Sequence, residues 1–443
     1  MHKTLFLVGA LVGAGLAILV TRPGVMSVGV SAVAAAPDTY QGLSLFGEVF
    51  DRVRADYVDR PDDHKLIESA LDGMLRELDP HSGYIDQANL DEMQRQSRGE
   101  FVGVGLEVAM EDGVLEVVTP IENSPAAKAG ISANDVITKI DNKPVRDMTL
   151  DQAVERLRGP KSTAVRLSIS RKGRNRLIEI TIIREVINVK SVQSRAEGND
   201  VGYIRITEFT EQTTDLLKTA TSELTRNVGA DNIKGFVIDL RNNPGGLFDQ
   251  AVSVTASFLD NGEIVSIRGR NAEDVGRYNA RASDLTKGKP LIVLINGGSA
   301  SASEIVAGAL QDRKRATIIG SRSFGKGSVQ TIIPLTGGEG ALRLTTARYF
   351  TPSGRSIQAK GIEPDINVLQ AVPGDLSGRI FIESEASLHR HLKAEGDEQS
   401  GSQSYVPGDK KDDRALQAAL DLLRGVTVNA AFPPTQSLIF RAY

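Results

Sequence analysis

The chain of 443 residues contains no cysteine. This absence excludes disulfide bonds, thiolate metal sites and a cysteine nucleophile, and it excludes a lipid-modified cysteine at the end of an export leader. Histidine is scarce as well, and the long central part of the chain contains none. The five histidines are His2, His64, His81, His389 and His391. A Ser-His-Asp triad in the central part would therefore need His81, His389 or His391 as its histidine.

A strong charge of either sign is also lacking. The formal net charge is −4, and 24% charged with 40% hydrophobic residues is the composition of an ordinary globular protein. Because no basic stripe stands out, nucleic acid is not an expected partner. A chain of 443 residues is too long for one hydrophobic core, so we expect two or more domains.

The N-terminus predicts export. An apolar run covers residues 5–20, and residues 32–36 offer small-residue cleavage sites. We expect cleavage after Ala34, because Pro37 disfavours the later site. The alternative is an uncleaved anchor, which would contact the inner membrane through the N-terminus alone. In both cases the protein is expected in the periplasm or cell envelope.

Hydrophobic periodicity changes along the chain and predicts its fold class. Helical spacing comes first, short strands with turn signals follow, and strands then alternate with helices. This order predicts a mixed α/β core with an inserted β-rich domain and an N-terminal helical segment. The expected parts are a leader or anchor (1–36), a helical cap or dimerisation segment (37–98), a β-rich domain (99–187), an α/β core (188–370) and a C-terminal linker, loose over 396–411, with a helical tail (371–443).

Small residues follow one predicted buried strand of the core. The strand over residues 290–295 leads to the run SASAS at 299–303, and a helix is expected to begin near Ala302. Ser301 would then lie beside backbone N–H groups and the helix dipole, which stabilise a developing oxyanion. Serine is also a preferred helix N-cap, so a structural role explains the motif equally well.

Lys326 is the candidate base for such a serine, in the run FGKGSVQ at 324–330. A lysine acts as a base only after losing its proton, so burial must lower its pKa from about 10.4 toward about 7. A surface lysine in a glycine turn is the structural alternative. Since the core lacks histidine, the Ser-Lys pair is the simpler hypothesis.

The glycines before this lysine also match the spacing of a phosphate-binding P-loop. Gly320, Gly325 and Lys326 fit the pattern. However, Gly327 stands where serine or threonine would bind magnesium, and residues 328–335 are typical of a strand instead of a helix. We therefore expect no nucleotide or metal site here.

Two glycines end another predicted strand. Residues 235–239 run into the sequence LRNNPGG, which closes with Gly245 and Gly246. A backbone amide at the carboxyl end of a buried strand suits an oxyanion donor. A plain strand-to-helix turn explains the same residues.

Together these motifs resemble the carboxyl-terminal processing peptidases, or tail-specific proteases. The resemblance covers about residues 40–370 and includes a PDZ-like segment. Its other motifs are LDPHSGY (78–84), DLRNNPGG (239–246), SASASE (299–304), FGKGSVQ (324–330) and YFTPSGRSIQ with GIEPD (349–365).

The resemblance implies a role for several residues near these motifs, and it implies neither a metal nor a cofactor. The residues are Ser301 as nucleophile, Lys326 as general base, Gln330 as the group that orients the lysine, Gly246 and Ala302 as oxyanion donors with Gly245 as the alternative to Gly246, and Asp312 in a supporting structural role.

The PDZ-like segment implies recognition of a peptide C-terminus. Gly103, Val104, Gly105 and Leu106 match the loop whose successive amides bind a terminal carboxylate by donating hydrogen bonds to it, and the strand that follows would pair with the peptide. The domain is expected either to recruit substrates or to cover the active site until a tail binds.

Arg158 is the residue that helps the PDZ domain switch between states in relatives. Here its run reads RGPKST at 158–163, and Ser162 replaces the second glycine of the usual pattern. This departure weakens a detailed role for Arg158.

The resulting hypothesis is an exported serine endopeptidase that recognises protein C-termini and cleaves or processively degrades envelope proteins through a Ser-Lys acyl-enzyme. The main alternative is a catalytically silent PDZ scaffold that binds C-terminal tails. A crotonase-like acyl-transfer enzyme would also have an α/β core and an oxyanion loop, but the sequence has no evident coenzyme A pocket. Expected partners are proteins and peptides with accessible C-termini, while an adaptor protein and self-association are left open.

Overall fold

The computed structural model describes residues 37–434, except 112, 175, 272, 282–283 and 375–382. The expected leader or anchor, residues 1–36, lies outside the described residues. Within the described ranges, no helix is both long and apolar enough to cross a membrane.

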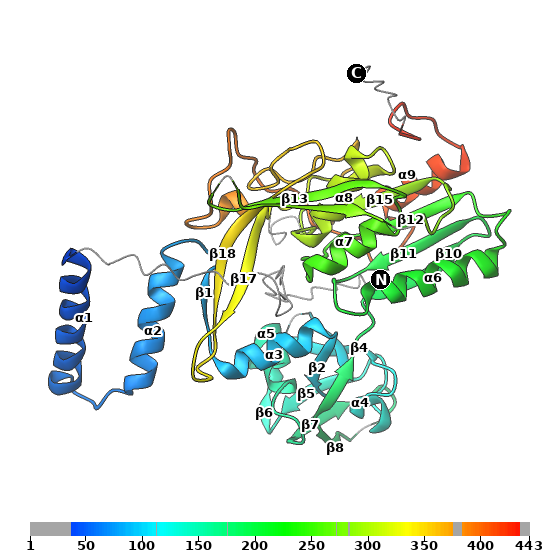
Figure 1. Ribbon diagram of the computed structural model, residues 1–443. Helices are drawn as coiled ribbons and strands as arrows, with labels where there is room; N and C mark the ends of the chain where they lie inside the picture. The colour runs from blue at the N-terminus through cyan, green and yellow to red at the C-terminus, as the bar shows by residue number, and fades with distance from the viewer. Residues whose placement is uncertain are drawn as a thin grey trace.

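A six-stranded sheet forms the centre of the molecule (Figure 1). Its strand order is β10-β11-β12-β15-β16-β19, in which β10 pairs antiparallel with β11 and the other pairs are parallel. The predicted α/β core is thereby confirmed. The strands are β10 (Val192–Glu197), β11 (Val201–Ile206), β12 (Gly235–Asp239), β15 (Leu291–Ile295), β16 (Thr317–Gly320) and β19 (Ile366–Asn367).

Helices cover both faces of this sheet, as its nearly continuous apolar strands require. On β12, Phe236 and Ile238 pack in the hydrophobic cluster of α6, α7 and α8, whereas Val237 packs with α9 on the other face. This alternation is the ordinary consequence of successive side chains pointing to opposite faces. The helices are α6 (Thr213–Val228), α7 (Phe248–Ala256), α8 (Ala302–Asp312) and α9 (Arg414–Arg424).

A second, five-stranded sheet connects the core with the N-terminal segment. Its strand order is β1-β18-β13-β14, and β17 pairs with β18. The strand β1 was not expected inside the helical segment 37–98, because three residues are too short to show a period and pairing with β18 forms the strand. The strands are β1 (Gly83–Ile85), β13 (Gly262–Arg268), β14 (Val275–Ala280), β17 (Ser328–Pro334) and β18 (Ala341–Phe350).

The β-rich domain has a hydrophobic core of its own. Leu115, Ile137 and Leu167 pack there in a cluster separate from those of the central sheet. The chain enters and leaves this domain through the antiparallel pair β2 and β9, which explains how it can be inserted before the core. The elements are β2 (Glu100–Gly103), β3 (Leu106–Glu111), β4 (Val114–Pro120), α4 (Pro125–Lys128), β5 (Val136–Ile140), β6 (Lys143–Pro144), the 3-10 turn η1 (Val145–Asp147), α5 (Leu150–Leu157), β7 (Ala164–Ser170), β8 (Ile178–Ile183) and β9 (Glu185–Asn188).

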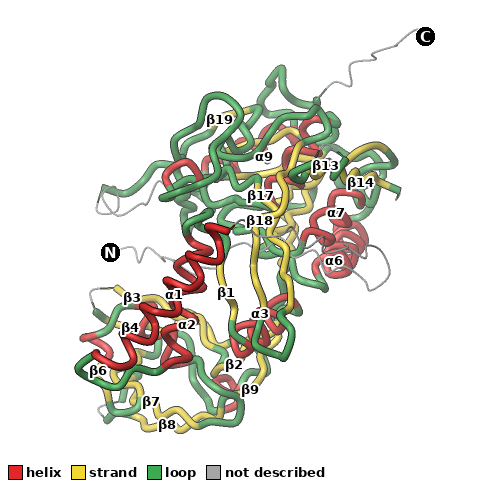
Figure 2. Tube along the Cα trace, turned by 60° about the vertical axis from the view of Figure 1, so that its left-hand side comes forward, coloured by secondary structure: helices red, strands yellow, loops and turns green. Residues whose placement is uncertain are grey.

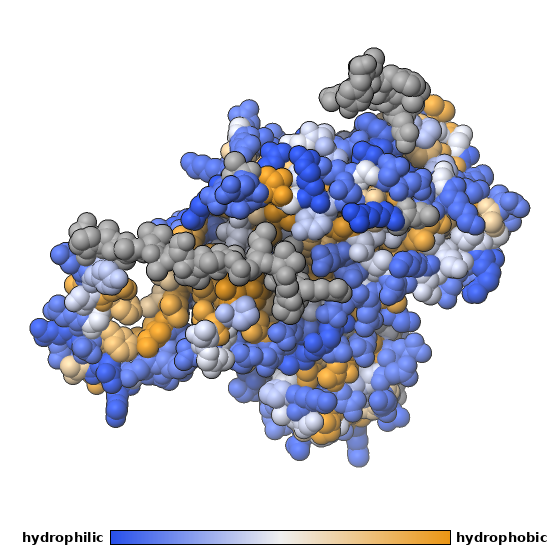
Figure 3. Space-filling view, in the orientation of Figure 1, coloured by the Kyte–Doolittle hydropathy of each residue, from blue (hydrophilic) through white to orange (hydrophobic). Residues whose placement is uncertain are grey.

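The N-terminal helices are α1 (Pro37–Asp56), α2 (Asp63–Arg76) and α3 (Gln87–Ser97). Helix α1 projects from the rest of the chain (Figure 1). Its large apolar residues Tyr40, Leu43, Phe46 and Val49 are exposed, and Figure 3 shows apolar surface in the region of α1 and α2.

The described residues between β19 and α9 are largely loop, drawn green in Figure 2, and contain the short 3-10 turn η2 (Glu385–Ser387). Residues 396–411 have no helix or strand, but the prediction of a loose linker was wrong. The carbonyl of Gln403 accepts hydrogen bonds from the Gly297 amide at 3.0 Å and from Ser321 Oγ at 2.8 Å. The tail is therefore fastened to the core beside the loop that carries Ser301.

Candidate active site

Ser301 lies at the N-terminus of α8, in the turn that follows β15. Its φ of 54° and ψ of −111° are unusual for a residue with a side chain, so the turn holds it under backbone strain. Ser301 is fully buried, and its Oγ has no hydrogen-bond partner among the described residues. A strained serine with an unengaged hydroxyl is the arrangement expected of a nucleophile at a strand-to-helix turn.

Glu304 holds this turn against the loop of Lys326. Its Oε2 accepts the amides of both Ser301 and Lys326 at 2.8 Å, so the two candidate catalytic residues are attached to one oxygen atom. Its Oε1 accepts the Gly325 amide at 2.7 Å and Ser323 Oγ at 2.5 Å. Burial raises the pKa of Glu304 to about 7, against the lowering effect of these donors.

The sequence analysis missed Glu304, although a signal for it was present. The spacing S-x-x-E is that of a helix capping box, in which the glutamate bonds the amide of the N-cap residue. Applied to Ser301, this rule predicts the hydrogen bond from the Ser301 amide to Glu304.

Lys326 is buried, as a lysine that acts as a base must be, with 3% of its surface exposed. The pKa of its amine falls from 10.5 to about 8, mainly because of burial and also because of the nearby positive charge of Arg343. Glu385, Asp79 and Glu304 act in the opposite direction. The neutral amine is therefore accessible at mildly alkaline pH.

Gln330 lies in β17, close to Lys326 in sequence, and is buried. Its Nε2 donates to Ser328 Oγ at 2.9 Å and to Thr345 Oγ1 at 3.1 Å. Its Oε1 has no hydrogen-bond partner among the described residues. A fixed amide with an unused acceptor suits the orientation of an amine.

The two glycines of the NPGG loop have different surroundings. A Cβ on Gly245 would lie 2.9 Å from Ser301 Cβ and 3.1 Å from the Ala302 nitrogen, so this glycine leaves room beside the nucleophile. Its own amide already donates to Asn243 Oδ1 at 2.9 Å. Gly245 is therefore a poor oxyanion donor.

Gly246 forms a parallel bridge with Phe209, but the two hydrogen bonds of that bridge are made by its neighbours Gly245 and Leu247. They run from the Phe209 amide to the Gly245 carbonyl and from the Leu247 amide to the Phe209 carbonyl. The Gly246 N–H therefore points away from Phe209. Within the described residues, neither this N–H nor that of Ala302 has an acceptor.

The candidate peptide-binding loop of the β-rich domain also presents open amides. Gly103 ends β2 and Leu106 begins the edge strand β3. Between them, the carbonyls of Val104 and Gly105 accept hydrogen bonds from Ala126 and Ile121, but no described residue accepts from their amides. An edge strand preceded by such amides is the geometry of carboxylate capture with β-augmentation.

Asp312 and Arg158 lie away from the nucleophile. Asp312 ends α8, pairs with Arg355, and accepts the Ser353 amide at 2.9 Å, which fixes the TPSGR turn. Arg158 follows the last residue of α5 and is partly exposed.

The LDPHSGY motif (78–84) follows α2, and its side chains hydrogen-bond to residues of the core and the tail. Asp79 Oδ1 accepts the amides of His81 and Ser82, and the side chain of Ser82 accepts the Thr345 amide at 3.2 Å. His81 bonds Glu385 instead of Ser301. A histidine triad therefore has no support in this structure.

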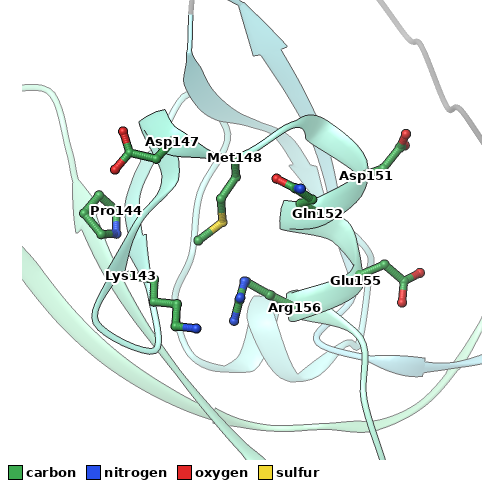
Figure 4. Close-up of a pocket in the computed structure, with 8 residues that line it drawn as sticks. All are labelled: Lys143, Pro144, Asp147, Met148, Asp151, Gln152, Glu155 and Arg156. Atoms are coloured by element: carbon green, nitrogen blue, oxygen red, sulfur yellow. The ribbon is translucent and has the colours of Figure 1, made fainter. Parts of the chain in front are cut away.

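A surface hollow of about 670 Å³ lies on the β-rich domain, away from these residues (Figure 4). Two basic and three acidic side chains line it, and it contains no pair that resembles a catalytic dyad. Its lining residues are Lys143, Pro144, Asp147, Met148, Asp151, Gln152, Glu155 and Arg156.

Three protein families match successive parts of this chain. Residues 26–89 match the domain described as "Activating protease CtpB N-terminal domain", residues 116–171 match "PDZ domain", and residues 200–368 match "Peptidase family S41".

Known proteins match over most of the length. A carboxy-terminal-processing protease of Bartonella bacilliformis is 54% identical over 405 residues, which cover 91% of this chain and 93% of that protein. The carboxy-terminal processing protease CtpA of Bacillus subtilis is 36% identical over 365 residues, which cover 81% of this chain and 75% of that protein. A crystal structure described as an S41 protease from Bacteroides fragilis shares the fold, with a TM-score of 0.51, 18% identity, and coverage of 86% of this chain and 98% of that one.

These matches agree with the resemblance drawn from the motifs and with the architecture described above. The chain belongs to the carboxy-terminal-processing proteases of peptidase family S41, and it carries a PDZ domain.

Proposed function

We propose that the chain is a serine endopeptidase in which Ser301 is the nucleophile and Lys326 the general base. The observation that carries this proposal is the shared Glu304 oxygen, which holds the amides of both residues at 2.8 Å. The unengaged Ser301 hydroxyl and the buried amine of Lys326 supply the two reacting groups.

The reaction follows from these groups. The neutral amine of Lys326 takes the proton of Ser301 Oγ while this oxygen forms a bond to the substrate carbonyl carbon. The amides of Ala302 and Gly246 donate to the oxyanion that forms. The Lys326 ammonium ion then gives its proton to the leaving amine, and water releases the acyl group in a second, equivalent step. Gln330 orients the amine through its unused Oε1.

The PDZ domain supplies the preference for C-termini in this proposal. The open amides of Val104 and Gly105 donate to the terminal carboxylate, and the edge strand β3 pairs with the residues before it. We place the substrates among exported or envelope proteins, because the first residues of the chain have the pattern of an export leader or anchor.

Hydrolysis of an unfolded protein by the purified chain tests the dyad. Ser301→Ala and Lys326→Ala are expected to remain folded by circular dichroism and to lose hydrolysis, whereas Lys218→Ala, on the exposed side of α6, retains it. The wild-type rate is expected to rise with pH, with a midpoint near the Lys326 pKa of about 8. Equal cleavage by Ser301→Ala would overturn the proposal, and absence of cleavage by the wild type would favour a scaffold that binds C-terminal tails.

A second proposal concerns self-association. Helix α1 exposes Tyr40 at 64% and Leu43 at 63% of their surfaces, together with Phe46 and Val49. Such a run of large apolar side chains on one helix favours contact with another copy of the chain. Light scattering of a chain beginning at residue 37 tests this, with Leu43→Glu and Phe46→Glu expected to lower the measured mass.

A further inference from the structure

Three segments far apart in the sequence meet behind Lys326. Glu385, in the tail, is completely buried. Its Oε2 lies 2.9 Å from Nε2 of His81, which comes from the turn between α2 and β1. Its Oε1 accepts a hydrogen bond from Gln358 Nε2 at 2.9 Å. A buried carboxylate is thus fixed by two partners in one orientation.

The same group is tied to the main chain on both sides of Lys326. The amide of Glu385 donates to the Phe324 carbonyl at 3.1 Å. The amide of Gly327 donates to Gln358 Oε1 at 3.1 Å. The loop that carries the base and the carboxylate behind it therefore form one rigid unit.

Glu385 is the charged group that acts most strongly on the Lys326 amine. Asp79, from the turn after α2, and Glu304, from α8, act in the same direction, and Arg343, from β18, opposes them. Burying a carboxylate is costly unless a positive charge or good hydrogen bonds compensate it. A positive charge forms at this place each time the lysine takes a proton.

We propose that Glu385, held by His81 and Gln358, is a positioning residue that orients the Lys326 amine and stabilises the ammonium ion formed when this amine takes the Ser301 proton. The inference rests on the proposed function, because it assigns the base to Lys326. In the step, the Oγ–H bond breaks, the Oγ–carbon bond to the substrate forms, and the proton goes to Nζ. Glu385 thus acts beside Gln330 on the base, in a role like that of the acidic group that orients the base in other serine peptidases.

The pH profile of hydrolysis by Glu385→Gln tests the proposal. Glutamine keeps the shape of the side chain but removes its charge, so the amine loses its proton more readily. We expect the midpoint of the rise in kcat/KM to move to lower pH by about one unit, while the plateau at high pH falls by up to roughly tenfold because the base is weaker. A purely structural residue would lower the whole profile without moving its midpoint.

Two further variants serve as controls. Glu398→Gln removes the carboxylate of another histidine pair in the same tail, where Glu398 Oε2 lies 3.0 Å from His391 Nε2 at the surface, and its profile is expected to match wild type. Glu385→Asp retains the charge and is expected to retain the wild-type midpoint. If Glu385→Gln does not fold, Glu385→Met repeats the removal of charge. Loss of folding in both neutral variants, or an unmoved midpoint, would overturn the proposal.

The protonation of Lys326 can also be followed without any hydrolysis. In Ser301→Ala protein with carbon-13-labelled lysine, the Cε resonance of Lys326, assigned with Lys326→Met, reports the pKa of the amine. Adding Glu385→Gln to this background is expected to lower that pKa by about one unit. If the wild-type chain is active but Lys326 titrates at the same pH with and without Glu385→Gln, the role of Glu385 is refuted and the proposed function is not. An inactive wild-type chain with the expected shift would refute only the proposed function.

Discussion

Lys326→Met is expected to abolish hydrolysis and, at neutral pH, to stabilise the fold. The pKa of the buried amine falls from 10.5 to about 8 because burial disfavours the ammonium ion. Below pH 8 the folded chain therefore contains a charge that would be better solvated in the unfolded chain. The difference between the two pKa values corresponds to roughly 3 kcal/mol, at about 1.4 kcal/mol per pH unit.

The sign of the pH dependence follows from the number of bound protons. Between about pH 8 and pH 10.5 the unfolded chain holds a proton at this lysine that the folded chain does not, so the free energy of unfolding of the wild type rises with pH in this window. Methionine has a similar length and no charge. The variant should therefore gain up to roughly 3 kcal/mol below pH 8, and the gain should shrink toward zero as the pH approaches 10.5.

Urea denaturation followed by far-UV circular dichroism at pH 7 and at pH 9.5 measures this difference for the transition of the core. Lys218→Met, on the exposed side of α6, is the control and should change little at either pH. If Lys326→Met were no more stable than wild type at pH 7, or equally stabilised at both pH values, the amine would not be desolvated. The argument for a lysine base would then fail.

Three further substitutions test the frame around the nucleophile. Glu304→Gln replaces one of the two carboxylate oxygens that accept hydrogen bonds from the loops of Ser301 and Lys326. We expect hydrolysis to fall by roughly a hundredfold with an unchanged circular dichroism spectrum. An unaffected rate would contradict this role. Gly245→Ala places a methyl group 2.9 Å from Ser301 Cβ at a φ of 110°. It should abolish hydrolysis but leave binding of a C-terminal peptide, measured by fluorescence anisotropy, intact. Asp413→Ala leaves the guanidinium of Arg241 buried with one carboxylate fewer, and should lower the free energy of unfolding by about 3 kcal/mol in urea. A loss below about 1 kcal/mol would show that the pair contributes little.

The candidate dyad could be found from the sequence because its signals are local. Ser301 stands where a buried strand ends and a helix begins, and Lys326 stands between two glycines in a core without histidine. The strands over residues 235–239 and 290–295 were predicted from local apolar runs for the same reason. Each of these strand, turn and helix signals lies within about ten neighbouring residues.

Other features depend on contacts between distant segments, and only the tertiary structure decided them. His81 and Glu385 are separated by 304 positions in the sequence, and neither carries a local signal for its partner. Likewise, the polar composition of residues 396–411 predicts a loose linker, because composition does not record the hydrogen bonds that Gly297 and Ser321 make to Gln403.

The sequence by itself therefore determined the fold class, and it supplied the motifs that make Ser301 and Lys326 the candidate nucleophile and base. Tertiary structure decided what surrounds them: the carboxylate of Glu304 that joins their loops, the burial that lowers the lysine pKa, and the tail that closes behind the amine. The physical reason is that periodicity and turn chemistry act between neighbouring residues, whereas desolvation and buried charge depend on every segment that packs around a group.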